Sequence, residues 1–243
     1  MTPRVNHYIS SQNGSLFTSC LAPKNHESWG LLIVNPMPHE QNRCTFFHRT
    51  LQQNLLKANI PSMRFDYSGT GDSTGSIGDS TIEHWIHDTD VCYKAFMKNL
   101  DLDFIYLLGT RIGGTIANTI ASRDSNLIPI LIDPIYSGKK HIKELESLQR
   151  DLLFNPLEAP FANNTKNEVM GFSFPEKIRQ SIESIRIDDK FSEIDHLFFS
   201  QENGDLNHYV DEDFGWNDIY KLRLQFIPKL IQQKTLGIIG GEL

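Results

Sequence analysis

The stretch LLGTRIGGTIA at residues 107–117 has the spacing of a nucleophile elbow. In that motif, G-x-S-x-G, an apolar strand turns sharply into a helix and exposes a nucleophilic side chain at the turn. The two glycines here are Gly109 and Gly113, and the apolar run FIYLL precedes the first of them. The central position holds Arg111 where the motif has serine. The stretch therefore predicts the backbone of an elbow without its nucleophile.

Short apolar runs alternate with amphipathic segments on both sides of the elbow. Apolar runs bounded by turn residues are typical of buried strands, and apolar residues three or four apart are typical of helices. A leading hairpin with its turn at Asn13–Gly14 comes first, and Thr81 is the expected N-cap of the second helix. The pattern predicts strands at 29–36, 61–69, 103–109 and 127–134, and helices at 44–59, 81–99 and 113–122. This alternation is typical of a mostly parallel sheet covered by helices on both faces.

The second half of the chain is less regular. Residues 137–170 are polar with scattered proline and asparagine, which predicts a small, reduced cap or insertion containing a helix at 138–154. The pattern then predicts a short strand, a turn at Pro175 and a helix over 171–187, a strand at 196–200, a closing helix at 216–233 and a mobile tail at 236–243. Without a repeat or a shift in composition, we expect one domain spanning residues 1–243.

Four segments stand in the order that an α/β-hydrolase fold requires. The stretch NPMPHEQN at 35–42 follows a core strand, where the oxyanion loop belongs. DYSGTGDS follows the next strand, and its Asp66 and Ser73 are the type of residue that holds a tight turn. The elbow comes third, and Asp133 at the end of a further strand comes fourth. Together they predict the α/β-hydrolase fold.

The same segments lack the groups that serine-hydrolase chemistry needs. A guanidinium stays protonated and has no usable lone pair, so Arg111 is not a nucleophile. The general base of this fold is a histidine just before the last helix, where the chain has Trp216. We interpret His208 as an ordinary surface histidine.

The remaining histidines and serines do not replace the missing groups. His84 and His87 belong to the second helix pattern and are read as core or surface residues, whereas His39, in the expected oxyanion loop, is a candidate to line the site. A conventional esterase using Ser68, Ser73 or Ser137 is disfavoured, because these serines lie in turns without a histidine in register.

Composition narrows the function classes. With 23 basic and 30 acidic residues the formal net charge is −7, and no basic cluster is present, so we expect no nucleic-acid partner. We expect neither a signal peptide nor a membrane span. Three widely spaced cysteines give neither a metal-ligand spacing nor a disulfide framework, which predicts a cytoplasmic protein without a metal or other cofactor.

The motifs together resemble the exosortase-associated α/β-hydrolases of the PEP-CTERM system. NPMPHEQNR at 35–43 is similar to the family's loop P-x-x-x-E-x-N, and MRFDYSGTGDSTG at 63–75 to its next turn. GTRIGG at 109–114 resembles the elbow G-L-R-L-G-A of one family branch, in which arginine also replaces the nucleophile.

Two later stretches resemble the same branch. EVMGFSFPEKIRQSIESIRI at 168–187 is similar to the segment before its closing section, and FGWNDI at 214–219 to its P-F-W motif, where the histidine base belongs. The resemblance runs from about residue 30 to 225. It implies the α/β-hydrolase fold and a setting close to exopolysaccharide export and protein sorting. It does not fix an activity, because fold does not fix function.

An arginine at the elbow has two interpretations. With the Ile112 N–H and the loop at 36–42, its guanidinium forms a receptor for a carboxylate or phosphate. Alternatively Arg111 pairs internally with Glu40 or Asp133 and closes the pocket, since a buried arginine needs a carboxylate partner. The two interpretations are compatible if a ligand competes for the guanidinium.

The predicted ligand-binding residues extend beyond that cluster. Met37 and Asn42 belong to the same loop, and Trp216 is either a packing residue or a wall of the site; the full set is Met37, Glu40, Asn42, Arg111, Ile112, Asp133 and Trp216.

Two functional hypotheses remain. The first is a pseudoenzyme that binds an anionic or acyl ligand, or a protein partner or second copy, through the old active-site cleft. The second is a hydrolase or acyltransferase with altered chemistry, in which Arg111 is an electrostatic stabiliser and Glu40, His39 or Asp133 supplies acid–base catalysis.

Overall fold

A computed structural model describes residues 5–153, 167–169, 171–186, 197–199, 235 and 237 of the chain. Its main sheet has strands in the order β1-β2-β4-β3-β5-β6-β9, and β7 pairs with β8 in a separate hairpin. The strands are β1 (Val5–Ser11), β2 (Gly14–Leu21), β3 (Trp29–Val34), β4 (Ser62–Phe65), β5 (Phe104–Thr110), β6 (Leu127–Ile132), β7 (Glu168–Val169), β8 (Phe172–Ser173) and β9 (Leu197–Phe199).

Helices join most of these strands. They are α1 (Pro38–Lys57), the short 3-10 helix η1 (Ile77–Asp79), α2 (Ile82–Leu100), α3 (Ile112–Ala121), α4 (Gly138–Leu153) and α5 (Glu176–Glu183). The expected alternation of strand and helix is therefore confirmed through β6, as are the helix over 138–154 and the strand within 196–200.

The sheet is antiparallel at one edge and parallel through its centre. β1 and β2 form the expected hairpin, and β2 pairs antiparallel with β4. The pairs β4–β3, β3–β5, β5–β6 and β6–β9 are all parallel. This mostly parallel sheet covered by helices is the predicted α/β-hydrolase architecture.

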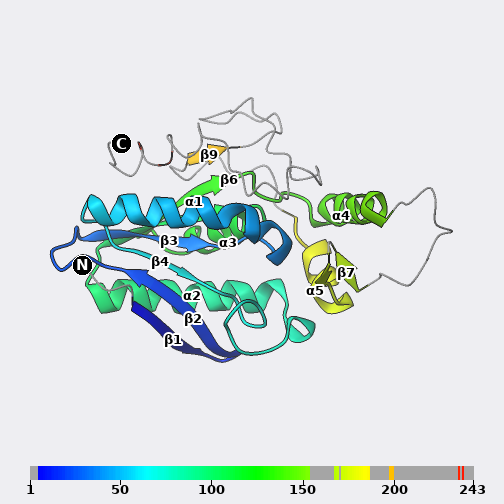
Figure 1. Cartoon of the computed structure of the whole chain (residues 1–243), viewed down its shortest axis with the longest axis horizontal. Helices are drawn as coiled ribbons and strands as arrows, with labels where there is room; N and C mark the ends of the chain where they lie inside the picture. Colours follow the sequence, from blue (N-terminus) through cyan, green and yellow to red (C-terminus); the bar gives the residue numbers. More distant parts are fainter. Residues whose placement is uncertain are drawn as a thin grey trace.

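Both faces of the sheet are buried, which explains the continuous apolar runs in its central strands. In β3, Leu32 and Val34 pack with helices α2 and α3, while Leu31 and Ile33 pack with α1. Figure 1 shows α1 and α2 on opposite faces of the sheet. Side chains alternate along a strand, so one run of apolar residues supplies both halves of the core.

Helix α1 begins six residues earlier than the sequence analysis predicts. The segment 36–42 was expected to be a loop, but the helix starts at Pro38 with Met37 as its N-cap. Proline suits the first helical position, because the N–H that it lacks has no partner in the helix. As a consequence His39 and Glu40 project from the first turn of a helix.

The turn between β4 and η1 has the predicted structural role. The backbone N–H of Asp72 donates to the Asp66 carboxylate at 3.0 Å, and the Ser73 hydroxyl donates to the Asp66 carbonyl at 2.6 Å. Ser73 also accepts from the Phe17 N–H at 2.8 Å, which fastens the turn to β2. Thr81 is the N-cap of α2 and accepts from the His84 N–H, as predicted.

Helices α4 and α5 lie beyond the carboxyl ends of the parallel strands (Figure 1). Helix α4 forms most of what the structure describes of the expected cap at 137–170; the residues 154–166 and 170 of that cap lie outside the described part of the chain. The expected closing helix at 216–233 and, apart from Gly237, the expected tail at 236–243 also lie outside it. None of the helices that the structure describes is long and apolar enough to cross a membrane.

Candidate functional site

The strand order alone indicates where a binding site is expected in this sheet. The chain leaves β3 toward β4 on one side and later returns to β5 on the other side of β3. In open α/β sheets, ligands bind at the carboxyl ends of the strands where the order reverses in this way. The segments at that point are the start of α1, which follows β3, and the elbow, which follows β5.

The elbow has the strained backbone that its spacing predicts. Arg111 has φ 53° and ψ −121° and lies between β5 and helix α3. A Cβ atom on Gly109 would lie 2.3 Å from the Gly113 carbonyl oxygen, and one on Gly113 would lie 2.3 Å from the Val34 carbonyl oxygen. Only glycine permits these approaches, so the two glycines set the close packing of helix against strand.

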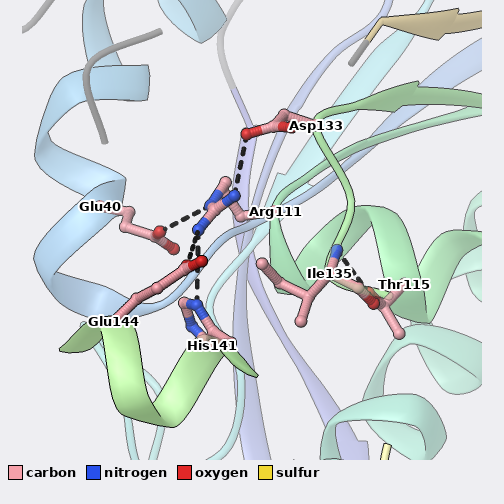
Figure 2. Close-up of polar contacts among 7 residues, drawn as sticks. All are labelled: Glu40, Arg111, Thr115, Asp133, Ile135, His141 and Glu144. Atoms are coloured by element: carbon pink, nitrogen blue, oxygen red, sulfur yellow. Dashed lines mark hydrogen bonds and ion pairs between the residues drawn. The ribbon is translucent and has the colours of Figure 1, made fainter. Parts of the chain in front are cut away.

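The Arg111 side chain binds the two carboxylates that the sequence analysis named. Its Nε donates to Glu40 Oε1 at 3.0 Å, and its Nη1 donates to Asp133 Oδ2 at 2.8 Å. Arg111 is 7% exposed, Glu40 2% and Asp133 6%. The sequence analysis predicted an ion pair of Arg111 with Glu40 or Asp133, and in the structure the guanidinium forms an ion pair with each of them (Figure 2).

Helix α4 supplies two further partners that the sequence analysis missed. His141 Nδ1 lies 3.4 Å from Arg111 Nη2, and Glu144 Oε2 lies 3.9 Å from the same nitrogen. His141 is buried, whereas the Glu144 side chain is 30% exposed. All three guanidinium nitrogens therefore have protein partners, drawn from α1, from the segment after β6 and from α4.

Thr115 on helix α3 fixes the segment that carries Asp133. Its hydroxyl donates to the Ile135 carbonyl at 2.8 Å and accepts from the Ile135 N–H at 3.1 Å. The Arg111 N–H also donates to the Ile132 carbonyl at 2.9 Å, which extends the β5–β6 pairing to the elbow. Both ends of the Arg111–Asp133 ion pair are thus anchored through their backbones.

The charges of the cluster stabilise one another. Burial alone would raise the pKa of Glu40, but the charge of Arg111 and its hydrogen bond to Glu40 hold that pKa below its ordinary value. Burial would lower the pKa of Arg111, but Glu40 and Asp133 raise it. At neutral pH the described cluster contains one guanidinium and three carboxylates, so its local formal charge is negative.

Both histidines of the cluster are held neutral. Burial, together with the charge of Arg111, lowers the pKa of His141 to about 3. Burial also lowers the pKa of His39, against the influence of Glu40 and with that of Arg111. His39 is therefore a buried neutral neighbour of the cluster, and among the described residues no hydrogen bond joins it to Arg111.

The other predicted site residues lie around this cluster or outside the described residues. Met37 and Ile112 are buried in the core, and Asn42 is exposed on α1. Trp216 and His208 lie outside the described residues, so the role predicted for Trp216 stays a prediction.

None of the three serines considered as alternative nucleophiles is paired with a histidine base in the described part of the chain. Ser73 holds the turn after β4, and the Ser68 hydroxyl is buried without a partner. The Ser137 hydroxyl accepts from the Lys140 N–H at the start of α4. Within the described ranges, none of these hydroxyls has a hydrogen bond to a histidine.

The sequence contains a periodic signal for His141. Residues 141, 142, 145 and 148 have the spacing of a buried helical stripe, and all four are buried. A histidine on such a stripe, just after a strand that ends in Asp133, is a candidate for the same site. Acidic and histidine side chains do gather here, but among the described residues no group of them is arranged to hold a metal ion.

Comparison with known proteins supports the fold. No family model matches the chain, and no curated protein matches it. The chain is similar to a carboxylesterase structure from the thaumarchaeon Nitrososphaera gargenis, with a TM-score of 0.61, 15% identity, and coverage of 96% of this chain and 98% of that chain.

Two further solved structures are similar over most of the chain. Est1E from Butyrivibrio proteoclasticus, solved with bound ferulic acid, has a TM-score of 0.53 and 19% identity, covering 80% of this chain and 77% of its own. A hypothetical protein from Pseudomonas aeruginosa has a TM-score of 0.58 and 13% identity, covering 82% and 77%. At these identities the likeness shows the α/β-hydrolase fold and nothing finer.

Proposed function

We propose that this α/β-hydrolase-fold chain is a non-catalytic or atypical binding protein whose ligand docks at the elbow. One observation carries the proposal: the guanidinium of Arg111 occupies the nucleophile position and is joined to Glu40, Asp133 and His141 at 3.0, 2.8 and 3.4 Å. A group held on every nitrogen neither attacks a carbonyl nor accepts a proton.

The test is chemical labelling of an activated serine. We expect no reaction with a fluorophosphonate probe and no hydrolysis of short p-nitrophenyl esters above a heat-denatured control. Arg111→Ser is expected to remain inactive, because it restores a hydroxyl but no base. Labelling of the wild-type chain at a serine, located by peptide mass spectrometry, would refute the proposal.

Of the two ligand chemistries expected from the sequence, anionic and acyl, the charges favour a neutral acyl group. A ligand anion would join three carboxylates around one guanidinium. An acyl carbonyl accepts hydrogen bonds without adding charge. Among the partners of Arg111 that the structure describes, Glu144 is the one that an anion would replace most readily, because its contact is 3.9 Å long and its side chain is partly exposed. Glu144→Gln is then expected to strengthen binding of an acyl carboxylate, and an unchanged affinity would leave the neutral group as the ligand.

The second candidate function is altered catalysis at the same site. It is favoured by the buried neutral histidines, His39 and His141, beside the ionised Glu40, since such pairs of groups are used for acid–base work. Arg111 would be the electrostatic stabiliser and Glu40, His39 or Asp133 the acid–base group. A panel of acyl esters, thioesters and amides, followed by mass spectrometry, tests this candidate. Turnover that Glu40→Gln abolishes would support it.

The resemblance of the sequence to the arginine branch of the exosortase-associated family extends the proposal. We place the protein in the cytoplasm, with a role connected to exopolysaccharide export, acting as a pseudoenzyme alone, as a homodimer or with a protein partner. Light scattering on the purified chain tests the homodimer, and fractionation of cells that make a tagged chain tests the location.

A further inference from the structure

Two polar atoms at the elbow are buried and have no hydrogen-bond partner. They are Glu40 Oε2 and His141 Nε2, and each side chain belongs to a residue that is 2% exposed. Buried polar atoms almost always have a partner, and one without it is costly. Both residues also contact the Arg111 guanidinium through their other polar atom. The two unpartnered atoms are therefore candidate contacts for a further molecule.

The contact with Arg111 fixes the tautomer of His141. A guanidinium nitrogen only donates hydrogen bonds, so His141 Nδ1 must accept and carries no proton. The neutral ring then carries its proton on Nε2. The unpartnered atom of His141 is a donor, and the unpartnered Glu40 Oε2, in an ionised carboxylate, is an acceptor.

The donor and the acceptor lie at the same guanidinium. Glu40 binds Nε and His141 binds Nη2, and these two nitrogens are bonded to one carbon. Figure 2 shows the Glu40 carboxylate on α1 and the His141 ring on α4 approaching Arg111 away from Asp133. A ligand that satisfies both atoms must accept one hydrogen bond and donate another.

We infer that the elbow binds an acyl amide, whose carbonyl accepts from His141 Nε2–H and whose N–H donates to Glu40 Oε2. This inference rests on the proposed binding of an acyl ligand and names its class. Esters, thioesters and amides are acyl groups that are neutral at pH 7. Of these three, only the amide has both a hydrogen-bond acceptor and a hydrogen-bond donor, because esters and thioesters have no N–H. A carboxylate lacks the donor and adds negative charge to a cluster that already contains three carboxylates.

The experiment compares matched acyl probes on histidine-labelled protein. Acetamide, methyl acetate and acetate, and then their six-carbon homologues, are titrated into the full chain with ¹⁵N-histidine. The His141 signal, assigned with His141→Gln, is followed by NMR. We expect a protonated Nε2, and we expect the amides to shift this signal and to bind about 10- to 100-fold more tightly than the esters, the usual effect of one unmatched buried hydrogen bond.

Glu40→Gln provides a specificity switch. Its side-chain oxygen still accepts from Arg111 Nε, but an NH₂ donor replaces Oε2, so the site then has two donors. We expect the preference to invert, with the ester bound at least as tightly as the amide. The matched control is His48→Gln, because His48 is equally buried, also has an unpartnered Nε2, and lies eight residues further along α1. This variant should keep the amide preference.

The outcomes separate the inference from the proposed function. Equal binding of the amide and the ester, tighter binding of acetate, or a proton on His141 Nδ1 would overturn the amide assignment while acyl binding stands. No binding of any probe would overturn both. If Glu40→Gln does not fold, the inference is still tested by the preference of the wild-type protein for the amide over the ester and by the nitrogen of His141 that carries the proton.

Discussion

Replacing Arg111 by methionine tests whether the elbow cluster is a structural lock. Methionine has a similar length but no charge, so the variant leaves the carboxylates of Glu40 and Asp133 buried at 2% and 6% exposure without their guanidinium. Removing one partner of a buried ion pair costs about 3–5 kcal/mol, because the remaining charge is uncompensated. Two buried carboxylates lose the same guanidinium here, so we expect a loss of about 4–5 kcal/mol, the upper half of that range.

Urea denaturation followed by circular dichroism measures this loss. With a denaturant slope of about 2–3 kcal/mol per molar, the expected loss lowers the urea midpoint by about 1.3–2.5 M. Arg111→Lys keeps the charge but not the planar fork, and its midpoint should fall between those of methionine and wild type. The triple variant that adds Glu40→Gln and Asp133→Asn should recover part of the loss, because neutral amides are less costly to bury.

The pH dependence gives the result that would refute this reasoning. In Arg111→Met, burial raises the pKa of Glu40 without the opposing charge of Arg111. The cost of burying its ionised form therefore grows as pH rises above the unfolded pKa of about 4.3 and shrinks as pH falls toward that value. The deficit relative to wild type should therefore shrink as pH falls from 7 to about 4. A midpoint within about 0.3 M of wild type at pH 7, or a deficit that is constant over this pH range, would show that the cluster contributes little.

Three further changes are expected to alter stability in defined ways. Burial and Arg111 lower the pKa of His141 to about 3. Below the unfolded pKa of about 6.5 the unfolded state binds a proton that the folded state does not, so the free energy of unfolding falls by about 1.4 kcal/mol per pH unit. His141→Gln should remove this slope from the pH profile of the free energy of unfolding, and parallel profiles of the variant and the wild type would contradict this. Gly113→Ala places a Cβ 2.3 Å from the Val34 carbonyl oxygen and should cost about 1–3 kcal/mol in thermal unfolding, whereas Gly237→Ala, with open space around the added atom, should cost almost nothing. Thr81→Ala removes the cap that accepts from the His84 N–H and should cost about 1 kcal/mol by the same measurement.

The parts of the fold that follow from local chemistry were predictable from sequence. The parallel strands are buried on both faces, so their apolar runs are continuous and easy to recognise. The spacing of Gly109 and Gly113 requires a close approach of helix and strand, and the structure contains it. The pairing of Arg111 with Glu40 and Asp133 followed from the need of a buried guanidinium for carboxylates.

The start of helix α1 was predicted wrongly for a local reason. The segment NPMPH contains two prolines and reads as a loop, but only Pro36 lies before the helix and Pro38 is its first residue. A proline at the first helical position and a proline in a loop look the same in sequence. The change matters for the site, because a helix holds His39 and Glu40 more firmly than a loop.

The contribution of helix α4 could not be derived from elbow motifs. His141 is 30 residues from Arg111 in the chain and belongs to a segment whose polar composition suggested a cap. Periodicity identifies the buried stripe of this helix but not the element that it faces. That information comes from the three-dimensional placement of α4 beyond the ends of the strands.

The same cluster has a consequence for the rates of folding and unfolding. The hydrogen bonds of Arg111 to Glu40, Asp133 and His141 span 71, 22 and 30 residues of chain. Contacts that close long loops cost more chain entropy to form, so we expect the hydrogen bonds of the guanidinium to form late in folding. Interactions absent from the transition state slow unfolding without speeding folding. We therefore expect the arginine at the nucleophile position to slow unfolding and so to lengthen the lifetime of the native state.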